Sequence, residues 1–152
     1  MTNNATDRIE KKIVLKASRS RVWRALTDSK QFGEWFLVAL EGEFVAGQRV
    51  TGRITHKGYE HLRFEVLVEK IEPETLFSMR WHPYAIDPAV DYSSEPMTLV
   101  EFRLKEIPEG IELSVVESGF DRIPAERRAE AFRMNEGGWS QQVKNIERYV
   151  TH

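Results

Sequence analysis

Glu101 and Glu117 place two carboxylates on neighbouring predicted strands. Glu101 is out of phase with the apolar residues Val100 and Phe102, so we expect it to face solvent. Glu117 is in phase with Val115, so its side chain is expected to face inward at the end of its strand. A carboxylate in that position can act as a general base. We favour the simpler interpretation, in which Glu117 lies at the rim and pairs with an arginine.

The histidines do not form a recognisable metal site. The chain has four of them, His56, His61, His82 and His152. His56 and His61 flank a predicted turn, but no carboxylate is spaced with them as a third ligand, and there is no His-Glu-x-x-His motif. We therefore predict no bound metal and interpret the histidines as polar residues of turns and strand ends.

Nucleotide and nucleophile motifs are also missing from the sequence. Residues 47–54 come close to a phosphate-binding loop, but Arg53 stands where the motif requires lysine and Ile54 where it requires serine or threonine. There is no Gly-x-Gly-x-x-Gly dinucleotide motif, no Gly-x-Ser-x-Gly elbow and no cysteine. We expect no cofactor.

The spacing of the apolar residues predicts a strand and two helices at the start of the chain, and after them a series of strands that form an antiparallel sheet. A strand is predicted at 9–16, a helix at Arg19–Thr27 after an N-cap at Ser18, and a second short helix from an N-cap at Ser29. Residues 83–96 contain three prolines and are expected to be a loop. Further strands are predicted at 41–45, 49–56, 62–71, 76–82, 98–105 and 111–117.

The last segment, 124–150, is predicted to be one long helix of about 40 Å. Its adjacent Gly137 and Gly138 cost a helix ~1 kcal/mol each relative to alanine. We expect a closely packed strand or a kink to explain the pair, in preference to room for a ligand. The predicted apolar face consists of Ala125, Ala129, Phe132, Glu136, Trp139, Val143, Ile146 and Val150.

Aromatic residues are abundant, with four Trp, eight Phe and four Tyr. Either they fill a core or they line a ligand cavity, in which the polar tips of Trp and Tyr orient the ligand. Tyr84 and Tyr92 lie on the proline-containing loop, which is expected to overhang the mouth of such a cavity. The predicted cavity-lining residues are Trp35, Phe36, Ile54, Phe64, Val66, Phe77, Met79, Trp81, Val100, Phe102, Val115, Phe132, Trp139 and Val143.

Composition limits the class of protein. The chain has 152 residues and a net charge of −2, which fits one domain, with residues 1–8 as a flexible N-terminus and 9–152 as the folded unit. Balanced charge gives no field that favours nucleic acid or acidic lipid. No signal peptide or run of about 18 apolar residues is present, so we expect a cytoplasmic protein without a membrane partner.

Several short motifs resemble one superfamily. They are 22–28 (VWRALTD), 32–36 (FGEWF), 79–81 (MRW), 100–102 (VEF), 117–120 (ESGF) and 137–139 (GGW). Together with the order of elements, they resemble the Bet v 1-like or START-like superfamily (SRPBCC). Within it the chain is similar to bacterial proteins related to the C-terminal domain of the activator of Hsp90 ATPase.

The resemblance implies an α+β helix-grip fold. In that fold a curved antiparallel sheet of six or seven strands wraps around the C-terminal helix, and two short helices follow the first strand. It also implies a hydrophobic pocket between the sheet and the helix.

Function is not fixed by this fold, because the superfamily includes lipid carriers, hormone receptors, polyketide cyclases and cochaperone domains. We predict non-enzymatic binding of a small hydrophobic molecule, aromatic or lipid-like. One alternative is an enzyme of the polyketide cyclase or dehydratase type, and a second is an Hsp90-related or other protein-interaction module. The chain lacks the N-terminal domain of eukaryotic activators, so we do not expect it to bridge a large partner. Open sheet edges would also allow a weak homodimer.

Overall fold

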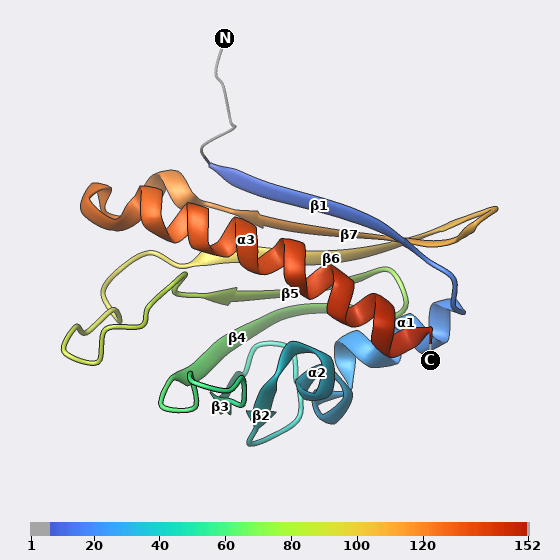
Figure 1. Cartoon of the computed structure of the whole chain (residues 1–152), viewed down its shortest axis with the longest axis horizontal. Helices are drawn as coiled ribbons and strands as arrows, with labels where there is room; N and C mark the ends of the chain where they lie inside the picture. The colour runs from blue at the N-terminus through green and yellow to red at the C-terminus, as the bar shows by residue number, and fades with distance from the viewer. Residues whose placement is uncertain (1–6, 152) are drawn as a thin grey trace, which may run out of the picture.

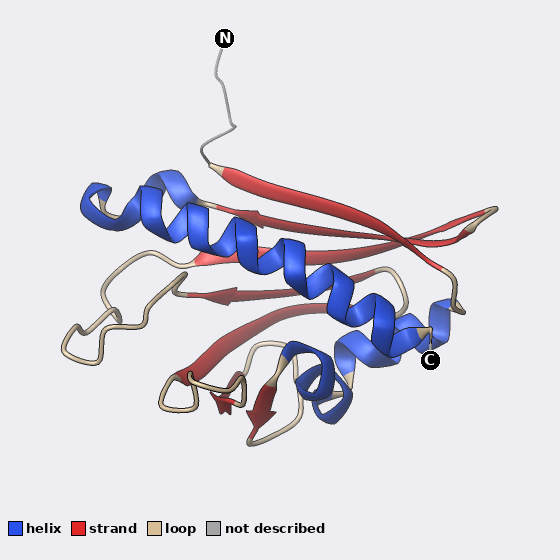
Figure 2. Ribbon diagram, in the orientation of Figure 1, coloured by secondary structure: helices blue, strands red, loops and turns tan. Residues whose placement is uncertain are grey.

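The fold is a seven-stranded antiparallel sheet with a long helix packed across one face, as predicted (Figure 1, Figure 2). The computed structural model describes residues 7–151. The strands lie in the order β1-β7-β6-β5-β4-β3-β2. The elements are β1 (Arg8–Leu15), α1 (Arg19–Thr27), α2 (Ser29–Phe36), β2 (Val38–Leu40), β3 (Arg49–Ile54), β4 (Arg63–Glu72), β5 (Leu76–Trp81), β6 (Thr98–Ile107), β7 (Gly110–Ser118), η2 (Phe120–Arg122) and α3 (Ala125–Val150).

Local side-chain chemistry sets the two short helices after β1. The Ser18 hydroxyl accepts a hydrogen bond from the Arg21 N–H and caps α1, as predicted. The cap of α2 is Asp28, not the predicted Ser29, because the Asp28 carboxylate accepts the N–H groups of the first turn. At the other end Leu37 adopts the left-handed conformation, with φ of 69°, and turns the chain directly into β2.

One predicted strand was wrong. Residues 41–45 carry no strand, and the strand in this part of the chain is β2, three residues earlier. The turn at Leu37 brings Val38 opposite Ile54, so pairing with β3 begins at once and ends at Leu40. Phe44 is buried nevertheless, through edge-to-face contact with Phe32 at 5.4 Å between ring centroids. The apolar side chain that suggested a strand therefore belongs to a loop residue that packs in the core.

The buried face of α3 follows the prediction only in its C-terminal half. Trp139, Ile146 and Val150 are buried as expected. In the first half Ala125 and Ala129 are exposed, and Ala131 is buried in their place. The predicted inward residue Glu136 is exposed, and its neighbour Asn135 faces inward, where its amide bonds to Glu117. The first half of α3 therefore faces the sheet with a different side from the predicted one, and the polar Asn135 lies against the buried Glu117.

No strand packs against Gly137 and Gly138, so the first of the two explanations that we predicted for this pair was wrong. Both residues are exposed, and a Cβ added to either would meet no heavy atom within 4 Å outside the local helix backbone. The helix runs through them without interruption from Ala125 to Val150. Close approach therefore does not explain this pair.

Two expectations about the whole chain concern its ends and its surroundings. Residues 1–6, most of the segment predicted to be flexible, lie outside the described residues, and β1 begins at Arg8. Among the described residues, no helix combines the length and the hydropathy that crossing a membrane requires.

Candidate functional site

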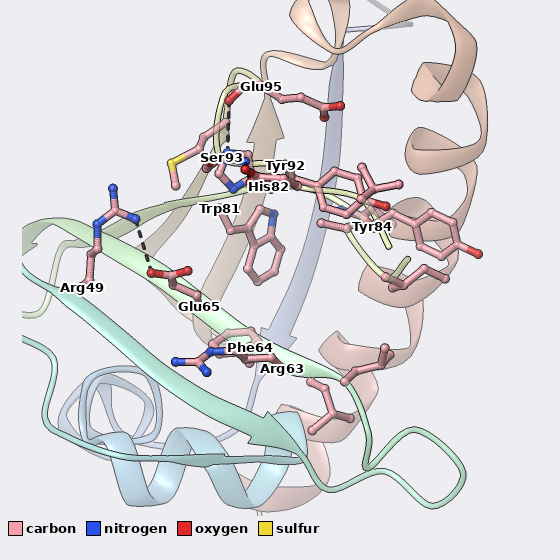
Figure 3. Close-up of a pocket in the computed structure, with 18 of the residues that line it drawn as sticks. Arg49, Arg63, Phe64, Glu65, Trp81, His82, Tyr84, Tyr92, Ser93 and Glu95 are labelled. Carbon is pink, nitrogen blue, oxygen red and sulfur yellow. Dashed lines mark hydrogen bonds and ion pairs between the residues drawn. The ribbon is translucent and has the colours of Figure 1, made fainter. Parts of the chain in front are cut away.

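A pocket of about 750 Å³ lies beside the end of β5 (Figure 3). Its walls come from the end of α2, from β3, β4 and β5, from Asn135 of α3 and from the loop of residues 82–97. Polar residues contribute to its outer parts, among them Arg49, Arg63, Glu65, His82 and Glu95. The apolar part of the lining consists of Phe36, Ile54, Leu62, Phe64, Trp81, Tyr84, Ile86, Val90, Tyr92 and Met97.

The pocket exists because β5 is shorter than its neighbour. β4 extends from Arg63, but its pairing with β5 begins only at Leu67, which lies opposite Arg80. β5 ends one residue later at Trp81, and the chain leaves the sheet as the predicted loop. The first residues of β4 therefore have a neighbour on the β3 side only, and the pocket occupies the other side.

Glu117 is fully buried at the end of β7, next to this pocket. One carboxylate oxygen, Oε2, accepts hydrogen bonds from Trp81 Nε1 at 2.7 Å and Thr98 Oγ1 at 2.6 Å. The other, Oε1, accepts from Trp139 Nε1 at 2.9 Å, and Asn135 Nδ2 donates to both oxygens at 3.0 and 3.1 Å. The inward orientation agrees with the strand phase. The favoured rim position with an arginine partner was wrong, because two indoles, a hydroxyl and an amide surround the carboxylate.

These hydrogen bonds fix two aromatic rings. The indoles of Trp81 and Trp139 are nearly parallel, at 19°, with centroids 5.7 Å apart. Trp81 lines the pocket and Trp139 lies behind it, buried. Since both oxygens of Glu117 already accept two or more donors, the carboxylate has little capacity left for a substrate proton. Its geometry is that of a group that positions the pocket wall.

Arg127 of α3 ties the loop over the pocket. Its Nε and Nη2 donate to Glu95 Oε1 at 2.9 and 2.7 Å, and its Nη1 donates to the Pro83 carbonyl at 2.7 Å. The guanidinium also lies over the Tyr92 ring, 4.8 Å from its centroid. The side chains of Arg127 and Glu95 are each only 18% exposed. This partly buried cluster holds both ends of the loop against the helix.

Exposed apolar residues of the loop line part of the pocket. Ile86 and Val90 on the loop are 40% and 44% exposed, and both line the pocket. His82 at the start of the loop donates a ring N–H to the Glu95 carbonyl, with 3.1 Å between Nε2 and the oxygen. We predicted that Tyr84 and Tyr92 overhang the pocket. Both residues line it, and in Figure 3 their labelled rings lie on the loop beside Trp81.

The predicted cavity-lining residues divide into two groups. Phe36, Ile54, Phe64 and Trp81 line the pocket. The other predicted residues pack in the core or against it and do not line the pocket; they are Trp35, Val66, Phe77, Met79, Val100, Phe102, Val115, Phe132, Trp139 and Val143.

Sequence reasoning missed Asn135, Leu62 and Met97 as lining residues. Asn135 was recognisable in principle, because it lies four residues before Trp139 and therefore on the same side of the helix. Leu62 and Met97 stand at the ends of predicted strands, where alternation carries no information about a pocket. Within residues 7–151 no three side chains of the His, Cys, Asp and Glu types are grouped to hold a metal ion.

Comparison with solved structures shows the same fold in other bacteria. The chain aligns with protein MLL2253 of Mesorhizobium loti at a TM-score of 0.74 and 23% identity, over 95% of this chain and 96% of that one. A protein of Arthrobacter aurescens aligns at 0.78 and 14%, over 99% and 90%. An Aha1 protein of Colwellia psychrerythraea, whose solution structure is a dimer, aligns at 0.69 and 16%, over 94% and 95%.

No curated protein matches the chain. The family model described as activator of Hsp90 ATPase homolog 1-like protein matches residues 16–151, from the end of β1 to the end of α3. That span includes every residue of the pocket, the buried Glu117 and the loop that Arg127 holds. The chain therefore belongs to the activator of Hsp90 ATPase homolog 1-like family, within the SRPBCC superfamily.

Proposed function

We propose that this protein binds a small, flat aromatic molecule in the pocket beside β5 and does so without chemical conversion. The observation that carries the proposal is the Trp81 indole, which forms a pocket wall and is held in place by buried Glu117. A ring fixed before binding loses little conformational entropy when a ligand stacks on it. The structure thus supplies a preorganised aromatic surface.

The surroundings of Trp81 favour an aromatic ligand over a flexible lipid chain. Phe36 and Phe64 lie 6.1 and 5.9 Å from the Trp81 ring, between centroids, and Tyr84 and Tyr92 come from the loop. Edge-to-face and stacked contacts with such rings add about 0.5–1.5 kcal/mol each beyond burial. The volume of about 750 Å³ falls within the usual range for small-molecule sites.

The enzyme alternative would assign Glu117 as the base. Its oxygens accept hydrogen bonds from Trp81, Thr98, Asn135 and Trp139. A general base must accept a proton from the substrate at hydrogen-bond distance. Proton transfer to Glu117 would require at least one of these donors to leave, so the arrangement supports binding better than catalysis.

A titration with 2-naphthol, followed by NMR shifts and tryptophan fluorescence, tests the proposal. We expect saturable quenching and shifts confined to the pocket. The matched variants are Tyr84→Ala, which removes a lining ring, and Tyr59→Ala, which removes a ring that is 53% exposed and outside the pocket. Tyr84→Ala should weaken binding several-fold, and Tyr59→Ala should leave it unchanged. Equal affinities of the two variants, or no saturation, would contradict the proposal.

A chaperone-directed role is the alternative that the family description favours. It predicts that the chain stimulates the ATPase of purified Hsp90. Stimulation that survives Tyr84→Ala would separate such a role from the pocket, whereas stimulation lost with that variant would connect the two.

Self-association is a further possibility suggested by the dimeric Aha1 structure. In the described part of the chain, β1 pairs only with β7, and its other edge is open. Charged residues Arg8, Glu10, Lys11 and Lys12 occupy this strand, which is how edge strands commonly avoid tight association. We propose a weak homodimer through this edge. Sedimentation that depends on protein concentration would support it, and a monomer at every concentration would refute it.

A further inference from the structure

β4 carries an unpaired stretch of backbone inside the pocket. The Val68 N–H donates to the Gln48 carbonyl at 3.0 Å, and the Leu62 carbonyl accepts from the Ile54 N–H at 3.1 Å. Residues 62 and 68 therefore direct their backbone groups toward β3. Direction alternates along an antiparallel strand, and the β3–β4 register is continuous from 63 to 67. Arg63 and Glu65 consequently direct N–H and C=O away from β3, toward the position that β5 vacates.

Those groups have no protein partner. The last β4–β5 pair is Leu67 with Arg80, and no hydrogen bond within the described residues reaches the backbone N–H or C=O of Arg63 or Glu65. Both residues line the pocket. In Figure 3, Trp81 lies between this strand and the opposite wall formed by His82 and its loop. A ligand that displaces water from these backbone groups must form hydrogen bonds with them in its place.

We propose that the ligand of this pocket carries a lactam, a cis amide in a ring, fused to its aromatic ring. The amide pairs with the edge of β4: its carbonyl accepts the Glu65 N–H, and its N–H donates to the Glu65 carbonyl. A strand residue presents these two groups side by side, and a lactam complements them, because its cis amide directs N–H and C=O to the same side. The ring then packs against Trp81. This inference rests on the proposed function and adds to it the chemical class of the ligand.

Three matched probes test the ligand side of the pairing. They are 2-quinolone, its ester analogue coumarin, which lacks the N–H, and N-methyl-2-quinolone, in which a methyl group replaces that hydrogen. The aromatic groups are the same in all three. We expect the ester and the N-methyl amide to bind about 5- to 10-fold more weakly than the parent amide, since each loses one shielded hydrogen bond.

Two substitutions at one position test the protein side. Glu65→Pro removes the N–H that faces the pocket and leaves the β3–β4 bonds in place, because Glu65 does not contribute its N–H to them. Glu65→Ala is the control, because it removes the exposed side chain and keeps the N–H. We expect 2-quinolone to bind Glu65→Pro at least 5-fold more weakly than Glu65→Ala, since the two variants lack the same side chain and only Glu65→Pro lacks the N–H. The probe series still decides the matter if Glu65→Pro does not fold.

The outcomes separate this inference from the proposed function. Equal affinity of the amide and the ester would overturn the amide pairing and leave aromatic binding intact. No binding of any probe would overturn both. The peptide acetyl-Gly-Phe-Gly-amide, compared with its N-methyl-Phe form, distinguishes the source of the amide. Preference for the peptide over 2-quinolone would overturn the lactam in favour of a peptide segment, whose residues also present N–H and C=O side by side, and the reverse preference supports a free small molecule.

Discussion

Trp81 and Trp139 stack at 5.7 Å and direct their indole N–H groups to opposite oxygens of one buried carboxylate. One ring belongs to a sheet strand and the other to α3, so the carboxylate of Glu117 links the two layers of the fold. The link also determines the orientation of the pocket wall. In a largely apolar core, this polar contact fixes the indole that forms a wall of the pocket.

Glu117→Gln is expected to lower the free energy of unfolding by about 2 kcal/mol, because hydrogen bonds to a charged acceptor are strong and an unpaired buried donor is costly. The glutamine amide would place its own N–H groups against donors from Trp139 and Asn135. Urea unfolding measures the loss. Near-ultraviolet circular dichroism should change as well, since the two indoles lose their fixed arrangement.

Glu101→Gln is the matched control. Glu101 lies on β6 opposite Val116, pairs with Arg103 at 2.8 Å and is on the polar side of the sheet. Such an ion pair contributes about 0–1 kcal/mol, so the control should have nearly the stability of the parent protein. Similar losses of unfolding free energy in Glu101→Gln and Glu117→Gln would show that the hydrogen bonds to the buried Glu117 stabilise the protein no more than the Glu101–Arg103 ion pair does.

Two substitutions of Trp139 separate packing from hydrogen bonding. Trp139→Ala removes a side chain that is 3% exposed and should cost ~3–5 kcal/mol. Trp139→Phe keeps much of the ring and loses only the donor to Glu117, so it should cost about 2 kcal/mol. Urea unfolding of both variants checks this order. An unchanged urea midpoint in Trp139→Ala would mean that this face of α3 is exposed in solution.

Arg127→Met should release the loop of residues 82–97 and keep the aliphatic packing of the side chain. The substitution removes the bonds to Glu95 and to the Pro83 carbonyl and the contact with the Tyr92 ring. We expect faster amide hydrogen exchange in the loop and faster dissociation of a bound aromatic probe. Arg133→Met, on the same helix with its side chain 72% exposed, is the control and should change neither.

Most of the fold could be predicted because the periodicity of the strands follows burial on one face. Phe64 and Phe102 each lie between two charged neighbours and are buried as expected. The pattern failed where apolar residues lie outside a regular element. Phe44 is buried from a loop, so its segment resembles a strand without being one.

The candidate site was harder to predict, because it depends on where a strand stops. The end of β5 at Trp81 opens the pocket, and strand ends are poorly marked by alternation. The partners of Glu117 come from β5, β6 and α3, far apart in the sequence. Asn135 in particular looks like a surface residue in a charged helix. Only the packing of the helix on the sheet brings it to a buried carboxylate.

Gly138→Ala is expected to stabilise the protein by roughly 0.4–1 kcal/mol, because alanine favours the helix and reduces the freedom of the unfolded chain. The added methyl meets no atom within 4 Å outside the local helix backbone, and the residue is exposed and lies outside the pocket lining. Ligand affinity should therefore stay the same.

Gly110→Ala is the contrasting variant, since its φ is +144° and a Cβ there would lie 2.4 Å from the Leu15 carbonyl oxygen. It should destabilise the β6–β7 turn by ~1–3 kcal/mol. Urea unfolding of the two variants gives opposite signs if α3 has the environment described, whereas a loss of stability in Gly138→Ala would place an unseen neighbour against the helix.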